Sequence, residues 1–198
     1  LYKNQSEFRK YNQSSPWAEA YYKKPRSYAY YADGKNPYHW MLHEATHQLL
    51  REASGYKPEK WTNEGIASYF GTSTLIGSEL QAGNFDTNTY PIWWLSTLNL
   101  SGNLKNDIER NTIIPLQQLL TNTGPDININ VNLYYMHYWS ISHFLMHYDN
   151  GRYSKKYKEL IALGGNIEDF EKLIGPVDQI QNEWYEYLNE NVNIAKSK

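Results

Sequence analysis

The chain of 198 residues contains no cysteine. This excludes disulfides, thiolate metal ligands and cysteine nucleophiles, although it does not fix the compartment. The chain also lacks a strong charge of either sign, with a formal net charge of −2 and 20% charged residues. Nothing in that balance indicates a nucleic-acid partner or an anionic membrane. No apolar run approaches the roughly 18–20 residues that a membrane span needs.

A signal-peptide pattern is also missing, and the first residue is Leu1. We therefore expect a mature or trimmed chain. We favour an exported protein, periplasmic or extracellular, whose signal segment is not part of this sequence. The length suits a single domain with a substantial core. No pattern in the sequence bears on the oligomeric state.

The clearest chemical pattern is the segment 43–47, which reads H-E-x-x-H. Residues four apart lie on the same face of an α-helix, so His43 and His47 can reach one Zn²⁺ with nitrogens about 2.0–2.1 Å away. Glu44 projects beside them and can take a proton from metal-bound water. The pattern therefore indicates a hydrolytic zinc site.

The segment that carries this motif is predicted to be a helix. Pro37 suits a first turn, apolar residues recur at helical spacing, and Gly55 follows as a stop. Taken alone, however, the motif also fits a surface helix that carries two histidines and a glutamate.

A second element favours the metal site. The segment 61–70 reads W-T-N-E-G-I-A-S-Y-F. A catalytic zinc usually takes three protein ligands and keeps a fourth position open for water. Glu64 can be the third ligand if a second helix, with Thr62 or Asn63 as its N-cap, packs against the first. The alternative is that Glu64 is a first-turn acid favoured by the helix dipole.

H-E-x-x-H followed by W-x-N-E-G-x-A-x-Y resembles the gluzincin metallopeptidases, the zincin clan whose third zinc ligand is a glutamate. The chain is similar to the zinc aminopeptidases and, more closely, to uncharacterised bacterial domains with the same peptidase core, in which H-E-A-T-H-Q-L-L and E-G-x-A-x-Y-F recur. The resemblance covers about residues 37–150. It implies a zinc-dependent peptidase with Zn²⁺ bound by His43, His47 and Glu64, and with Glu44 as the general base and acid.

The resemblance also implies an oxyanion-stabilising residue. In the aminopeptidases a tyrosine at the start of a helix has this role, and alignment on the pair Phe144-Leu145 places Tyr135 there. Packing is the alternative role for Tyr135. The thermolysin-like pattern has an acidic residue four positions after the third ligand, where this chain has Ser68, so the group that orients the ligand histidines is not identified.

Four residues are candidates for contacts with the ligands or for lining the cleft: Ser68, Asn63, His39 and His137. His39 lies one turn before His43, where it either lines the cleft or sits on the surface. His137 lies close to Tyr135 in sequence and is a candidate for binding the tetrahedral intermediate. His143 and His147 are also four apart but have no carboxylate beside them, so we expect a packed or solvent-facing pair rather than a second metal site.

The sequence predicts one mainly α (α+β) domain over residues 1–198, with a zincin-like fold. Residues 1–36 are expected to form a small N-terminal sheet region, with a short helix over 16–24 and a strand over 27–32 whose edge can hold an extended substrate. Residues 37–150 form the metal-binding and catalytic core. A helix over 92–98 is predicted to bury Trp93 and Trp94 in the core, with a sugar-stacking platform as the alternative.

Residues 151–198 are predicted to be a helical closing segment. Apolar spacing and terminal glycines indicate helices over 153–163, 167–173 and 177–189. No chemistry is visible in this segment.

The expected partner is a peptide or protein substrate. The amine-anchoring G-x-M-E-N motif of the aminopeptidases is absent, and Gly71 replaces the acid that they commonly carry, which argues against exopeptidase activity. An anchoring segment upstream of this sequence is the alternative, so the choice between endo- and exopeptidase stays open. Two other classes remain open. One is a catalytically inactive zincin-like domain that binds a protein or glycan, and the other is a structural zinc domain with four protein ligands.

Overall fold

A computed structural model of the chain describes residues 1–16, 18–32, 36–53 and 57–197. These residues are mainly helical and include two small antiparallel sheets of two strands each. The expectation of a mainly α class is therefore confirmed. The described helices include none long and apolar enough to cross a membrane.

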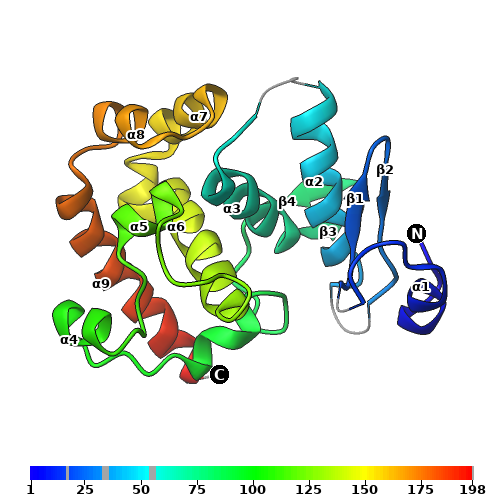
Figure 1. Cartoon of the computed structure of the whole chain (residues 1–198), viewed down its shortest axis with the longest axis horizontal. Helices are drawn as coiled ribbons and strands as arrows, with labels where there is room; N and C mark the ends of the chain where they lie inside the picture. The colour runs from blue at the N-terminus through cyan, green and yellow to red at the C-terminus, as the bar shows by residue number, and fades with distance from the viewer. Residues whose placement is uncertain (17, 33–35, 54–56, 198) are drawn as a thin grey trace.

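The structure has an N-terminal part and a larger helical body, and helix α3 (Lys60–Gly71) lies between them (Figure 1). The N-terminal part contains α1 (Gln5–Tyr11), β1 (Tyr21–Lys23), β2 (Arg26–Tyr28) and α2 (His39–Ala53). The middle of the chain forms α3 (Lys60–Gly71), β3 (Thr74–Ile76), β4 (Glu79–Gln81) and the 3₁₀ helix η1 (Ile92–Thr97). The helical body contains α4 (Leu104–Glu109), α5 (Leu116–Thr121), α6 (Val131–Gly151), α7 (Ser154–Leu163), α8 (Ile167–Leu173) and α9 (Val177–Lys196).

The closing segment forms the three predicted helices, and α9 extends further than expected, to Lys196. Apolar residues recur along α9 at helical spacing, and Trp184 and Leu188 among them are fully buried. Asn166 caps α8 by accepting a hydrogen bond from the Asp169 N–H. Gly164 ends α7 in a left-handed conformation with φ of 98°, which a residue without Cβ adopts at little cost.

The N-terminal region differs from the prediction. A helix is expected over 16–24, but residues 21–23 form β1, which pairs antiparallel with β2 so that Tyr21 lies opposite Tyr28. Their rings stack with centroids 4.7 Å apart, and such cross-strand aromatic pairs stabilise a hairpin. The predicted strand over 27–32 is shorter and ends at Tyr28. The expected turn at 33–34 and the helix stop at Gly55 lie outside the described residues.

Helix α3 packs against both α2 and α6. Its contact with α6 therefore helps to set how its side chains, Glu64 among them, lie against α2. Gly65 faces α6 at very short range. A Cβ built on Gly65 would lie 2.8 Å from the backbone oxygen of Tyr138 and 2.3 Å from Oγ of Ser142. Only glycine therefore fits at this crossing.

We expect Gly65→Ala to destabilise the fold by about 1–3 kcal/mol, because the Tyr138 carbonyl belongs to a helix and cannot turn away. Urea unfolding monitored by tryptophan fluorescence measures the loss. Gly71→Ala is the matched control on the same helix, since a Cβ there meets its nearest neighbour at an ordinary 3.5 Å. Equal stability of the two variants would show that the contact between α3 and α6 does not require glycine at position 65.

Candidate metal centre

Helix α2 presents His43, Glu44 and His47 to the interior, with 7%, 9% and 8% of each residue exposed. The Nε2 atoms of the two histidines lie 3.1 Å apart. Four residues make just over one helical turn, so the spacing of the motif places both imidazoles above one another on one face.

Glu64 comes from α3 and completes the group. Its Oε2 lies 3.5 Å from Nε2 of His43 and 3.5 Å from Nε2 of His47. The three residues expected as metal ligands therefore converge from two neighbouring helices.

The geometry of this group fits one small metal ion. Ligands about 2.05 Å from a tetrahedral ion lie about 3.3 Å from one another, close to the 3.1 and 3.5 Å found here. Oε2 of Glu64 is buried without a hydrogen-bond partner among the described residues. Buried acceptors are normally paired, and a cation would satisfy this one. The buried group of His43, His47 and Glu64 can thus hold a metal ion.

Asn63 orients one of the two histidines. Its Oδ1 lies 3.2 Å from Nδ1 of His47. Since an amide oxygen only accepts hydrogen bonds, Nδ1 carries the proton and Nε2 keeps its lone pair for a metal. The predicted N-cap at Thr62 or Asn63 is wrong, because α3 begins at Lys60. Asn63 instead lies inside the first turn, where its amide reaches α2.

Charge separates the roles of the two glutamates. Burial raises the pKa of Glu64, but the close imidazoles of His43 and His47 outweigh burial and hold the pKa well below its usual range. Burial also raises the pKa of Glu44, and there it exceeds the opposing effect of the two histidines. Glu64 is therefore a fixed anion suited to a cation, and Glu44 is the more basic carboxylate.

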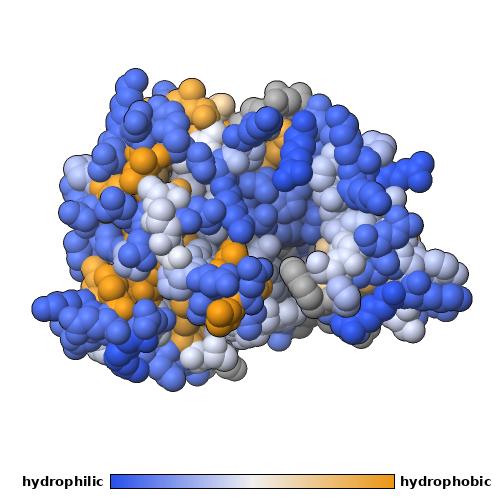
Figure 2. Space-filling view, in the orientation of Figure 1, coloured by the Kyte–Doolittle hydropathy of each residue, from blue (hydrophilic) through white to orange (hydrophobic). Residues whose placement is uncertain are grey.

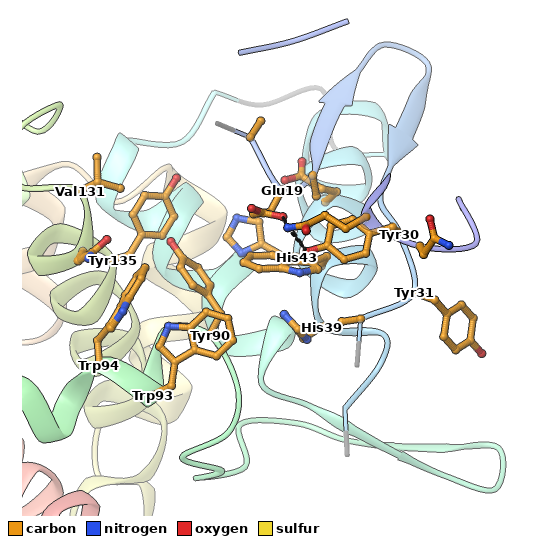
Figure 3. A pocket seen from close by; sticks show the side chains of 18 of the residues that line it. Glu19, Tyr30, Tyr31, His39, His43, Tyr90, Trp93, Trp94, Val131 and Tyr135 are labelled. Atoms are coloured by element: carbon orange, nitrogen blue, oxygen red, sulfur yellow. Dashed lines mark hydrogen bonds between the residues drawn. The ribbon is translucent and has the colours of Figure 1, made fainter. Parts of the chain in front are cut away.

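A cavity of about 1060 Å³ opens beside this group, between the N-terminal part and the helical body. Figure 2 shows the surface hollowed between these two parts. His43 and Glu44 line the cavity, with Glu19 and Tyr30 on one side of it and Val131 and Tyr135 on the other (Figure 3). A ligand in the cavity would thus have direct access to Glu44.

Strand β1 runs along the Glu44 side of the site. The backbone N–H of Tyr22 lies close enough to the Glu44 carboxylate to lower the pKa of this group slightly, against the effect of burial. In the hairpin, Tyr22 lies opposite Ser27, whose Oγ is 3.0 Å from the Glu44 carbonyl oxygen. The sequence places the substrate-holding edge on the 27–32 strand, and residues 30–32 of that stretch line the cavity. The role of this edge in holding a substrate stays a prediction.

Two tyrosines lie beside the metal ligands. Tyr135, from the first turns of α6, lines the cavity with its ring centroid 6.2 Å from that of His43. Tyr90 comes from the chain before η1. Its ring centroid lies 6.4 Å from that of His43 and 5.5 Å from that of Tyr135. Burial raises the pKa of both phenols well above the usual value, and Glu64 and Glu44 add to this, so both are protonated donors at neutral pH. The sequence identifies Tyr135 but misses Tyr90, which no motif marks.

The other candidate residues have different positions. His39 lines the cavity, with Nδ1 2.8 Å from the Asn36 carbonyl oxygen. Ser68 is fully buried on α3 and its Oγ has no described partner, so it does not take the place of the acid that orients a histidine in the thermolysin-like pattern.

The proposal that His137 binds the tetrahedral intermediate is wrong. His137 is fully buried in the core, where its Nδ1 bonds to the Leu133 carbonyl oxygen and its Nε2 accepts from the Ile114 N–H. Tyr135 and His137 are two residues apart on one helix, about 200° around its axis. When Tyr135 faces the cavity, His137 must face away from it.

Protonation of His137 is expected to destabilise the fold in acid. Burial lowers its pKa to about 4, below the ordinary value of 6.5. As the pH falls from 6.5 to 4, this imidazole becomes protonated in the unfolded chain but stays neutral in the folded chain. The free energy of unfolding therefore falls by about 3 kcal/mol over this range. Urea unfolding at several pH values should show a shallower pH dependence for His137→Gln than for wild type. His147→Gln, at an exposed position, should change the slope less. If stability depended on pH equally in His137→Gln and wild type, the acid destabilisation would not come from His137.

The pair at 143 and 147 has a structural role. His143 bonds through Nε2 to the Gly83 carbonyl oxygen and through Nδ1 to the Tyr187 hydroxyl. His147 is exposed and bonds to the Tyr69 hydroxyl. These bonds connect α6 to α3, to α9 and to the chain after β4, in agreement with the expectation of a packed or solvent-facing pair.

Trp94 packs against the core, in line with the prediction, whereas Trp93 does not. Both are partly exposed and line the cavity with Trp40. Their planes are 77° apart, and Trp40 is 73° from Trp93, so they form an edge-to-face wall rather than one flat platform.

Comparison with known proteins finds no family model, no curated protein and no solved structure that matches this chain.

Proposed function

We propose that the protein is a zinc-dependent peptidase of the gluzincin type, with a zincin-like fold. The observation that carries this proposal is the convergence of His43, His47 and Glu64 beside Glu44 at the wall of a large cavity. Two imidazoles and one carboxylate are a ligand set typical of catalytic zinc, which leaves a coordination place open. A structural zinc would need a fourth protein ligand, and the group found among the described residues has three members.

Zinc held by these residues supplies Lewis acidity, which polarises a carbonyl group and makes water reactive at neutral pH. The chain supplies the proton transfers. Glu44 takes a proton from the attacking water on its carboxylate, and it then gives this proton to the nitrogen of the leaving amine as the C–N bond breaks. Glu44 is not a member of the ligand group, so its carboxylate stays available for both steps. Water thus adds across the peptide bond, and Glu44 returns to its starting state.

Tyr135 is the donor to the carbonyl oxygen in this proposal. Its hydroxyl is protonated and lies beside the ligand group, where negative charge develops during attack. A preorganised donor at such a position commonly contributes about 10²–10³ in rate.

The cavity supports a peptide as the substrate. It is large enough for several residues of an extended chain, and residues 18–20 and 30–32, on either side of the β1–β2 hairpin, line it together with Glu44. The peptide would lie between these residues and the aromatic wall of Trp40, Trp93 and Trp94.

Metal analysis and cleavage profiling test this function together. We expect one zinc per chain by mass spectrometry of the purified protein, and cleavage of a peptide library that stops with a chelator and returns with zinc. A protein with one zinc bound that leaves every peptide intact would overturn the peptidase assignment. It would favour the non-catalytic binding domain instead.

A further inference from the structure

Tyr90 occupies a position at the site that no sequence motif marks. It precedes η1, and its ring is packed by Trp40, Trp93 and Trp94, with centroids 4.9, 5.7 and 5.3 Å away. All three contacts are tilted or edge-to-face, so the ring is held from several directions. The aromatic wall therefore fixes the direction in which the Tyr90 hydroxyl points.

That hydroxyl is free to bind a ligand. It has no hydrogen-bond partner among the described residues, and it is not among the buried polar atoms that lack one, so it is open to the cavity that Tyr90 lines. Other tyrosines near the site differ in this respect. The Tyr30 hydroxyl donates to Glu19 at 2.6 Å, and the Tyr134 hydroxyl donates to the Pro125 carbonyl oxygen at 2.8 Å.

Tyr90 and Tyr135 lie side by side, on the same wall and next to His43 (Figure 3). They come from separate elements, the chain before η1 and the start of α6. Two phenol groups thus approach the ligand group from the same side. An oxyanion gains more from two preorganised donors than from one, because its oxygen can accept two hydrogen bonds at once.

We propose that Tyr90 is a second hydrogen-bond donor to the oxygen of the scissile carbonyl, paired with Tyr135. This inference rests on the proposed peptidase function and adds a catalytic residue to it. The O–H of Tyr90 donates to the carbonyl oxygen as charge builds on it, and the phenol keeps its proton throughout. The aromatic wall has the supporting role of holding the donor in place.

The Tyr90→Phe variant tests the proposal, since it keeps the ring and removes only the hydroxyl. With a peptide that wild type cleaves, we expect kcat to fall about 10²–10³-fold while KM changes little. Tyr134→Phe is the matched control, because it removes a hydroxyl from the neighbouring residue of Tyr135 outside the cavity, and it should keep wild-type kcat.

Binding provides a second readout that does not depend on turnover. A phosphonamidate peptide carries a charged oxygen where the reaction develops one, so Tyr90→Phe should weaken its binding by a factor similar to the fall in kcat. Binding of the uncleaved parent peptide to a Glu44→Gln/Tyr90→Phe double variant should match that to Glu44→Gln alone. Calorimetry measures both.

The outcomes separate the two proposals. If wild type cleaves peptides and Tyr90→Phe matches it in kcat and in analogue affinity, the donor role of Tyr90 is overturned and the peptidase function stands. If Tyr90→Phe weakens the analogue and the uncleaved peptide equally, Tyr90 acts in ground-state binding and the donor role is again overturned. If zinc-loaded wild type cleaves no peptide, both proposals fail.

Discussion

Glu44→Gln is expected to keep zinc bound while peptide hydrolysis falls by about 10²–10⁴-fold, the usual contribution of a positioned general base. Glutamine has nearly the same shape as glutamate but cannot accept the proton of the attacking water. The ligand atoms of His43, His47 and Glu64 do not include Glu44, so the metal site should remain intact. Steady-state kinetics together with zinc analysis of the same sample measure the two effects.

Glu52→Gln is the matched control for this change. Glu52 lies on the same helix, two turns further along, and is exposed. It should retain wild-type activity, since its carboxylate faces solvent and accepts a hydrogen bond from the Tyr22 hydroxyl. Full activity of Glu44→Gln would remove the proposed mechanism, and loss of zinc from this variant would mean that Glu44 is itself a ligand.

Glu64→Ala is expected to abolish the stabilisation of the protein by zinc. The wild-type fold should gain about 2.7 kcal/mol when free zinc is 100 times its dissociation constant. Without the Glu64 carboxylate only two imidazoles remain, and zinc affinity should fall by more than about 100-fold, which is the upper range for loss of an outer-shell partner alone. Thermal unfolding with and without zinc measures the difference as a shift in Tm.

The metal-free protein provides an internal check on the Glu64 variant. Glu64 raises the pKa of His47 against the effect of burial, so the substitution should also lower that pKa in the absence of zinc. NMR titration of the histidines follows this directly. Glu159→Ala, which removes an exposed acid on α7, is the control and should leave both the zinc-induced shift and the pKa unchanged. A zinc-induced rise in Tm that survives in Glu64→Ala would show that zinc binds elsewhere.

Local spacing predicts part of the site reliably. A separation of four residues places His43 and His47 on one face of any α-helix, whatever surrounds it. The same rule excludes His137 once Tyr135 faces the cavity, because residues two apart point in nearly opposite directions. Both conclusions depend only on helical geometry, and the second corrects the placement of His137 beside the substrate.

Contacts between distant segments are harder to predict. Tyr90 reaches the site from an irregular stretch of chain, where no period relates one side chain to the next. Trp93 and Trp94 fit a buried helix by composition, but packing against Trp40 and Tyr90 places them on the cavity wall. Asn63 fits an N-cap by residue type, and it contacts His47 only because α3 starts at Lys60.

By itself, the sequence determined the mainly helical class, the three closing helices, and the pairing of two imidazoles with Glu44 on one helix. These follow from apolar periodicity, glycine stops and the helical repeat, all of which act between residues close in the chain. Only the tertiary structure decided that Glu64 meets the imidazoles, that Asn63 orients His47 and that Tyr90 joins Tyr135. Those contacts depend on how closely α3 approaches α2 and α6, and packing between distant segments sets that approach.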